Sequence, residues 1–90
     1  MKNPNIKVFE KFFGVEFTPC ESSNIEAYAK IADGVSVSTD ILILYKNLKC
    51  YRYIGAGKLY EELTQADSKG KWVNANLVRG NFKIMKYEYK

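Results

Sequence analysis

The sequence predicts one α+β domain, with a small antiparallel sheet of three to four strands and two to three short helices. Residues 25–31 alternate with the period of a strand, and residues 41–46 form a continuous apolar run. Apolar side chains recur at helical spacing in residues 4–13 and 59–66. The chain has 90 residues, which is enough for one compact domain but not for two.

The amino-terminal residues predict a short helix and then an extended stretch. Asn3-Pro4 opens the helix and Gly14 ends it, because proline suits the first helical position and glycine the position after the last turn. Residues 15–18 are expected to be extended, up to Pro19. One side of the helix is apolar, and is either a core stripe or an exposed partner face: Ile6, Phe9, Phe12 and Phe13.

The middle of the chain predicts the sheet. Residues 25–31 are expected to form a half-buried strand, with two distinct faces. One face holds Ile25, Ala27, Ala29 and Ile31, and the other holds Glu26, Tyr28 and Lys30. Residues 41–46 are apolar on both faces, which predicts a central strand.

Three polar segments separate these strands. Asp33-Gly34 marks a turn, and Ser38-Thr39-Asp40 is expected to be a polar link. Asn47-Leu48-Lys49 predicts the turn into a strand at residues 50–54, because asparagine tolerates the left-handed conformation that such a turn requires.

The carboxyl-terminal part predicts two short helices and a final strand. Gly55-Ala56-Gly57 ends the preceding strand, and a helix over residues 58–66 follows. Ser68 can cap a second helix that runs through Leu77. After a turn at residues 79–81, residues 82–89 form a last strand whose free edge would allow a dimer.

The composition argues against an enzyme. The sequence contains no histidine, which excludes Ser-His-Asp and Cys-His catalytic pairs and any Cys/His zinc site. Cys20 and Cys50 are 30 positions apart, a spacing that matches no metal or redox motif. We expect two reduced thiols, no metal, no cofactor and no catalytic residues.

Nothing in the sequence predicts export or membrane insertion. Lys7, Glu10 and Lys11 interrupt any signal-peptide core, and the apolar run at residues 41–45 is too short to span a bilayer. We therefore expect a cytoplasmic protein without a membrane partner.

Charge is distributed unevenly along the chain. The net charge is +4, but residues 1–45 carry four basic against six acidic side chains, a net −2. Residues 46–90 carry ten basic against four acidic side chains, a net +6. A basic half is either an electrostatic footprint for a polyanion or the result of lysine serving solubility.

The order of motifs resembles the KTSC domain, a short module at the carboxyl end of some lysyl-tRNA synthetases and in small bacterial and phage proteins. The motifs are Ser22-Ser23-Asn24-Ile25, Tyr51-Arg52-Tyr53, Leu59-Tyr60-Glu61-Glu62-Leu63, Ala66, Ser68-Lys69-Gly70-Lys71-Trp72, Asn74 and Arg79. The resemblance implies RNA binding and brings no catalytic motif. Leu48 stands where the family usually has glycine. The resemblance covers residues 21–90 and leaves residues 1–20 as an additional helical and extended arm.

Three groups of side chains are candidates for binding. Tyr51 and Tyr53 share a face of their strand and form a stacking platform for bases if exposed, or pack beneath the helices. In the second case Arg52 points outward and is the better contact, near Tyr28 or Lys30 if the two strands are neighbours. The second group is the cations near the start of the second helix and their neighbours: Lys69, Lys71, Trp72, Arg79 and Lys83. The third is the tail at residues 82–90, where lysines alternate with aromatic residues. This pattern suits single-stranded nucleic acid, or equally a final strand whose edge lysine keeps soluble.

The segment Ser68-Lys69-Gly70-Lys71 suggests an anion site. Two lysines beside the free backbone N–H groups of a helix start can hold a phosphate, and Gly70 would let it approach closely. The alternative is a solvated turn with Trp72 in the core.

The leading hypothesis from the sequence is a non-catalytic RNA- or nucleotide-binding module with a basic, aromatic-bearing surface. The alternative is a stand-alone phage or bacterial interaction or inhibitor protein. That alternative would use the aromatic arm, which an isolated RNA module does not need.

Overall fold

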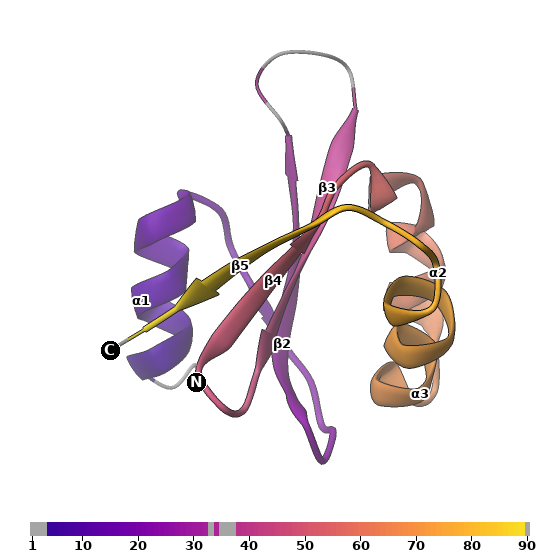
Figure 1. The fold of residues 1–90 in the computed structure, drawn as a ribbon. Helices are drawn as coiled ribbons and strands as arrows, with labels where there is room; N and C mark the ends of the chain where they lie inside the picture. Colours follow the sequence, from indigo (N-terminus) through magenta and orange to yellow (C-terminus); the bar gives the residue numbers. More distant parts are fainter. Residues whose placement is uncertain (1–3, 33, 35–37, 90) are drawn as a thin grey trace.

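The computed structural model describes residues 4–32, 34 and 38–89, and it confirms the α+β prediction (Figure 1). The helices are α1 Pro4–Phe13, α2 Tyr60–Gln65 and α3 Lys69–Val73, with the 3₁₀ segment η1 Ala56–Leu59 and the π-helical segment η2 Asn74–Val78. The strands are β1 Thr18–Pro19, β2 Ile25–Ala32, β3 Thr39–Tyr45, β4 Lys49–Tyr53 and β5 Ile84–Glu88. The sheet has five strands rather than three or four, because the stretch after α1 pairs with β2 through two residues.

The sheet is an antiparallel meander between two helical layers. Its strands follow chain order, and every neighbouring pair is antiparallel. α1 lies on one face of the sheet, and α2 and α3 lie on the other (Figure 1). β3 is covered on both faces, since Ile41 to Leu44 have no exposed surface. The prediction of a central strand at residues 41–46 is therefore confirmed.

Each face of the sheet has its own core. The α1-side core consists of Ile6, Phe9, Phe17, Ala27, Ala29, Leu42, Leu44 and Cys50. The opposite core, which we call the α2/α3-side core, consists of Ile25, Tyr28, Ile41, Ile43, Tyr53, Ala56, Leu63, Val73 and Leu77. Two cores in so short a chain require the sheet residues of both faces to be apolar.

The faces of β2 differ from the prediction at two residues. The register against β3 shifts between Ile25 and Ala27, so a bulge turns Ile25 to the α2/α3 side while Ala27 stays on the α1 side. Tyr28 is buried, because helices cover the face that was expected to be half-open. β2 is thus an internal strand on which Tyr28 is buried, while Glu26 is half-buried and Lys30 is exposed as a half-buried strand predicts.

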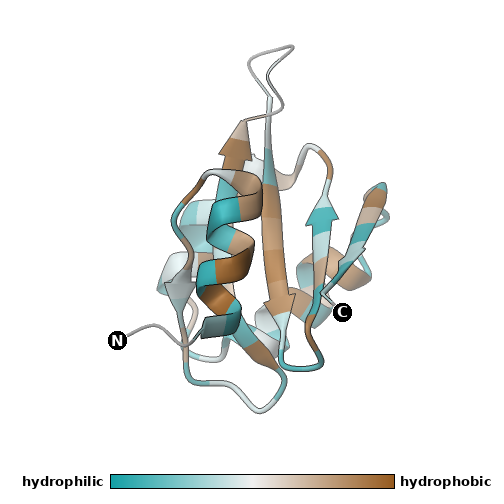
Figure 2. Cartoon of the chain, turned by 90° about the vertical axis from the view of Figure 1, so that its left-hand side faces the viewer, coloured by the Kyte–Doolittle hydropathy of each residue, from teal (hydrophilic) through white to brown (hydrophobic). Residues whose placement is uncertain are grey.

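The arm of residues 1–20 is part of the folded unit wherever the structure describes it. Ile6, Phe9 and Phe17 are buried against the sheet. Figure 2 shows α1 in front of the sheet, with hydrophobic and hydrophilic residues alternating along it. The core-stripe interpretation therefore holds for Ile6 and Phe9, whereas Phe12 is 67% exposed.

The turn between β3 and β4 contains a strained residue. Leu48, and not Asn47, adopts the left-handed conformation, with φ of +68°. The Asn47 side chain instead accepts a hydrogen bond from the Lys49 N–H through Oδ1 at 3.1 Å, which mimics a backbone turn. A residue with a side chain thus stands in a conformation that favours glycine.

Asp40 is a buried carboxylate within β3. The expected polar link at residues 38–40 is wrong for Thr39 and Asp40, because both belong to the strand. Asp40 Oδ2 accepts from Arg52 Nε at 2.7 Å, and Oδ1 accepts from the Gly55 N–H at 2.7 Å. One side chain thus joins β3 to β4 and to the turn after β4.

The described residues also test the predicted turn after β2 and the expected lack of a membrane span. The predicted turn at Asp33-Gly34 includes Asp33, which lies outside the described residues; Gly34 has φ of +79°. Within the described residues, every helix is too short or too polar to cross a membrane.

Replacing Leu48 with glycine should stabilise the fold. The left-handed conformation costs a side-chain-bearing residue about 1–2 kcal/mol, part of which glycine loses again through unfolded-state entropy. We expect Leu48→Gly to raise the free energy of unfolding by about 0.5–1 kcal/mol, measured by urea unfolding. Lys49→Gly, one position along and within β4, is the control and should lower stability. A Leu48→Gly variant no more stable than wild type would contradict the strain.

Removing the charge of Asp40 should destabilise the fold. Asp40→Asn keeps the shape but leaves Arg52, whose side chain is 17% exposed, without its counter-ion. We expect a loss of about 2–3 kcal/mol, below that of a fully buried pair. Urea unfolding followed by Trp72 fluorescence measures it. Asp67→Asn, at an exposed aspartate, is the matched control, and equal stability of the two variants would show that the pair contributes nothing.

Candidate functional site

A polar pocket of about 450 Å³ lies between the loop that precedes β2 and the start of α3. It is lined by Glu21, Ser22, Ser23, Asn24, Ser68, Gly70, Lys71 and Asn74. Two segments that are about 45 positions apart in the sequence therefore meet at one site. Most of the lining groups are hydroxyls and amides, which can donate and accept hydrogen bonds, and Lys71 supplies a positive charge.

Local hydrogen bonds hold the loop side of the pocket. Ser22 Oγ accepts from the Ile25 N–H at 3.3 Å and lies 3.0 Å from Asn24 Oδ1. The Asn24 carbonyl accepts from the Lys46 N–H at 2.9 Å, which ties the loop to the end of β3. Hydrogen bonds within the loop therefore hold the Ser22 side chain, and a backbone bond to Lys46 holds the loop at Asn24.

The helix side of the pocket begins at a capped helix start. Ser68 Oγ accepts from the Lys71 N–H at 3.4 Å, which confirms the predicted cap. Gly70 lies against the loop: an added Cβ would be 3.0 Å from Asn24 Oδ1 and 3.1 Å from Ser22 Oγ. Glycine at this position lets the helix approach the loop, whereas the sequence suggested that it would let a phosphate approach.

The two lysines of this segment have different roles. Lys71 is exposed and lines the pocket. Lys69 Nζ donates to the carbonyls of Thr64 at 3.1 Å and Ala66 at 2.6 Å, at the carboxyl end of α2. It also lies 5.9 Å from the centre of the Tyr28 ring. Lys69 thus satisfies helix-end carbonyls, a favourable place for a cation.

The tyrosine pair does not form an open stacking platform. Tyr53 is fully buried in the α2/α3-side core, and its hydroxyl lies 2.8 Å from that of Tyr45. The stacking role required an exposed ring. A buried ring offers no face to a base, so Tyr53 does not have this role. Tyr51 is half-buried against the same core, with Lys86 Nζ 5.5 Å from its ring centre.

Arg52 does not lie where the sequence suggested. It extends over the α1 side of the sheet and pairs with Asp40, instead of pointing outward near Tyr28 or Lys30. The reason is the strand order, because β4 pairs with β3 and β5 and not with β2. The ion pair with a buried carboxylate joins β4 to β3, so the role of Arg52 is structural.

The remaining candidates divide between core and surface. Trp72 is half-buried against the α2/α3-side core, as the alternative interpretation expected. Arg79 and Lys83 are exposed at the two ends of the segment between η2 and β5. The predicted cations that are exposed are therefore Lys71, Arg79 and Lys83, of which Lys71 lines the polar pocket.

The pocket contains residues to which the sequence assigned no role. Ser22, Ser23, Asn24 and Asn74 were part of the family resemblance but not of the candidate site. Their signal is that polar, uncharged side chains recur in both segments of the motif. The described residues contain no group of three or more histidine, cysteine, aspartate or glutamate side chains that could hold a metal ion.

Comparison of the chain with known proteins finds no matching family model, no matching curated sequence and no matching solved structure. The resemblance to the KTSC domain therefore stays a prediction.

The stability of the fold should decrease in alkaline solution. Burial raises the pKa of the Cys50 thiol from 9.0 to about 12, and it raises the pKa of the Tyr45 and Tyr53 hydroxyls above 10.0. Above about pH 9 the unfolded chain releases protons that the folded chain retains, so the free energy of unfolding falls as pH rises. Below that pH these groups are protonated in both states and add no pH dependence.

Urea unfolding at about pH 7.5 and about pH 10.5 measures this effect. Tyr53→Phe removes one of the hydroxyls and should make the loss between the two pH values smaller. Tyr89→Phe, at an exposed tyrosine, should leave the loss unchanged. A Tyr53→Phe variant with the same pH dependence as wild type would contradict the assignment to Tyr53.

Proposed function

We propose that the chain is a non-catalytic RNA-binding module of the KTSC type, in which the polar pocket holds the phosphate backbone. The observation that carries the proposal is the meeting of the Ser22–Asn24 and Ser68–Lys71 segments around that pocket. Both segments belong to the motif pattern of the family, and they leave hydroxyl, amide and ammonium groups facing one space. These are the side chains that proteins use on phosphate and sugar oxygens.

The distribution of charge supports an anionic ligand. Residues 46–90 carry a net +6, and Lys71, Arg79 and Lys83 are exposed cations of that half. Glu21 is the acidic residue in the pocket lining, and it sits at the loop side, across from the helix that contributes Lys71. RNA can extend beyond the pocket, whereas a single nucleotide would contact only the lining.

A binding role fits the side chains better than a catalytic one. Cys50 is buried with its pKa raised to about 12, so it carries no thiolate at neutral pH. Asp40 is engaged with Arg52 and Gly55. The sequence has no histidine to serve as a base.

A protein-binding role is a second candidate, favoured by the exposure of Phe12 on α1. Most of the apolar arm is core, so the alternative drawn from the sequence now rests on this ring and its neighbours on β5.

Binding of a fluorescein-labelled single-stranded RNA, followed by anisotropy at several salt concentrations, tests the RNA proposal. Each phosphate contact should contribute about −0.7 to the slope of log K against log salt. Lys71→Ala should lower the affinity about three- to tenfold and reduce the slope by about 0.7.

Lys7→Ala is the matched control, because Lys7 is an exposed lysine on α1, the helix on the other face of the sheet. It should leave affinity and slope unchanged. Adenosine monophosphate in excess, as a competitor, distinguishes RNA from a single nucleotide. Absence of binding at low salt, or equal effects of Lys71→Ala and Lys7→Ala, would rule out the proposed site.

A further inference from the structure

The outer edge of β5 carries backbone groups that the described part of the sheet leaves open. β5 ends the strand order, with β4 on its other side. The Lys83 carbonyl accepts from the Ile54 N–H at 2.9 Å, and the Tyr89 N–H donates to the Leu48 carbonyl at 3.2 Å. The backbone N–H and C=O groups of successive residues point to opposite edges of a strand. Those of the odd-numbered residues of β5 therefore point toward β4. The N–H and C=O groups of residues 84, 86 and 88 therefore point outward.

The two edges of the sheet differ. β1 has only two residues, and one of them is Pro19, which has no N–H group. β5 has five residues and pairs with β4 without a bulge. Short strands and prolines are means by which proteins blunt a sheet edge. β5 is thus the edge that can accept another strand.

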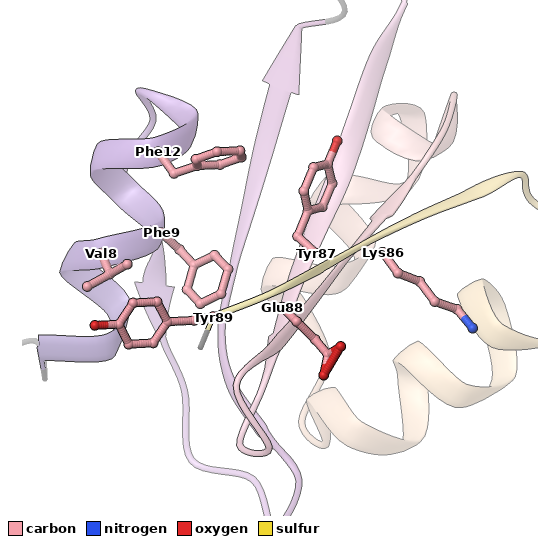
Figure 3. A pocket seen from close by; sticks show the side chains of 7 residues that line it. All are labelled: Val8, Phe9, Phe12, Lys86, Tyr87, Glu88 and Tyr89. Carbon is pink, nitrogen blue, oxygen red and sulfur yellow. The ribbon is translucent and has the colours of Figure 1, made fainter.

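Apolar side chains gather beside this edge. The described chain has five large hydrophobic side chains that are exposed, and four of them lie on or next to β5 or on the adjacent α1: Phe12, Ile84, Met85 and Tyr89. Between α1 and β5 lies an open groove of about 340 Å³. Figure 3 shows Phe9, Phe12 and Tyr89 around it, and the Phe12 and Tyr87 ring centres are 5.8 Å apart.

We propose that a second copy of this chain pairs with β5 along its free edge, antiparallel about a two-fold axis at Tyr87. The outward-pointing residues must then face one another as hydrogen-bonded pairs. In this register Lys86 lies opposite Glu88 of the second copy, and Glu88 lies opposite its Lys86. The strand is thus complementary in charge to itself, and this selects a second copy as the occupant.

Neighbouring registers lack this complementarity. A shift that puts the axis at Lys86 places that lysine opposite its own counterpart, and like charges directly opposite destabilise a strand pair. A shift of the axis to Met85 places Lys86 opposite Ile84. Only the register centred on Tyr87 joins both charged residues of the edge in opposite-sign pairs.

The same register aligns the apolar residues of the α1 side. Met85 lies opposite Tyr89 of the second copy, and the two Tyr87 rings meet at the axis. The apolar side chains of Phe12, Tyr87 and Met85 then meet those of the second copy, beside the groove of Figure 3. The interface would join the two sheets into one and cover the exposed apolar side chains.

Charge reversal tests the pairing. Wild type should be a dimer by sedimentation velocity at micromolar concentration. Lys86→Glu alone and Glu88→Lys alone put like charges opposite each other, and each should be monomeric. An equimolar mixture of the two variants restores both opposite-sign pairs and should form a heterodimer. The double variant Lys86→Glu/Glu88→Lys keeps both opposite-sign pairs of the proposed register and should dimerise with itself.

A cross-link tests the axis. Tyr87 forms a pair without hydrogen bonds, with Cα atoms about 4.5 Å apart, within the range that a disulfide spans. Tyr87→Cys should give a covalent dimer on oxidation, whereas Met85→Cys, two residues along on the same face, should not. The proposal would be overturned if the wild-type chain were monomeric at every concentration. A monomer that binds an extended peptide of another protein at β5 would overturn it in the same way. So would a mixture of charge variants that stays monomeric, or equal cross-linking of both cysteine variants.

The pocket and the edge have no lining residue in common. The outcome at β5 therefore does not depend on whether the polar pocket binds RNA.

Discussion

The burial of β3 on both faces is the constraint on which the rest of the structure depends. Four successive residues, Ile41 to Leu44, have no exposed surface, so each face of the sheet needs a helical cover. α1 supplies one cover, and α2 with α3 supplies the other. A small domain rarely has enough apolar surface for two cores. Here the aromatic residues of the arm supply part of the second one, and this explains why the arm is not a separate appendage.

One polar interaction is placed within this apolar frame. Asp40 begins the buried part of β3, and its two oxygens bind Arg52 and the Gly55 N–H. The contact orients β4 and the left-handed turn after it, where the chain leaves the sheet for α2. After this turn the chain continues into η1, α2 and α3, and the start of α3 meets the loop before β2 at the polar pocket.

The fold was more predictable from the sequence than the site. Period-two alternation, helix caps and turn residues act over a few positions, so α1, β3 and the Ser68 cap were predicted close to their observed bounds. The errors have local causes that a pattern does not contain. A bulge turned Ile25 to the other face, and the left-handed residue of the turn was Leu48 and not Asn47. For the site, Tyr53 was buried and Lys69 was engaged with the end of α2.

By itself, the sequence determined the α+β class, the order of the elements, the basic carboxyl-terminal half and the lack of any histidine. These properties depend on composition and on spacing between near neighbours. Only the tertiary structure decided which cations are free. Arg52 pairs with Asp40 on the neighbouring strand, and Lys69 donates to carbonyls at the end of α2. The tertiary structure also decided that Ser22–Asn24 and Lys71 share a pocket and that β5 is the open edge. Strand order and the packing of helices on the sheet bring distant residues together, and no local pattern records that.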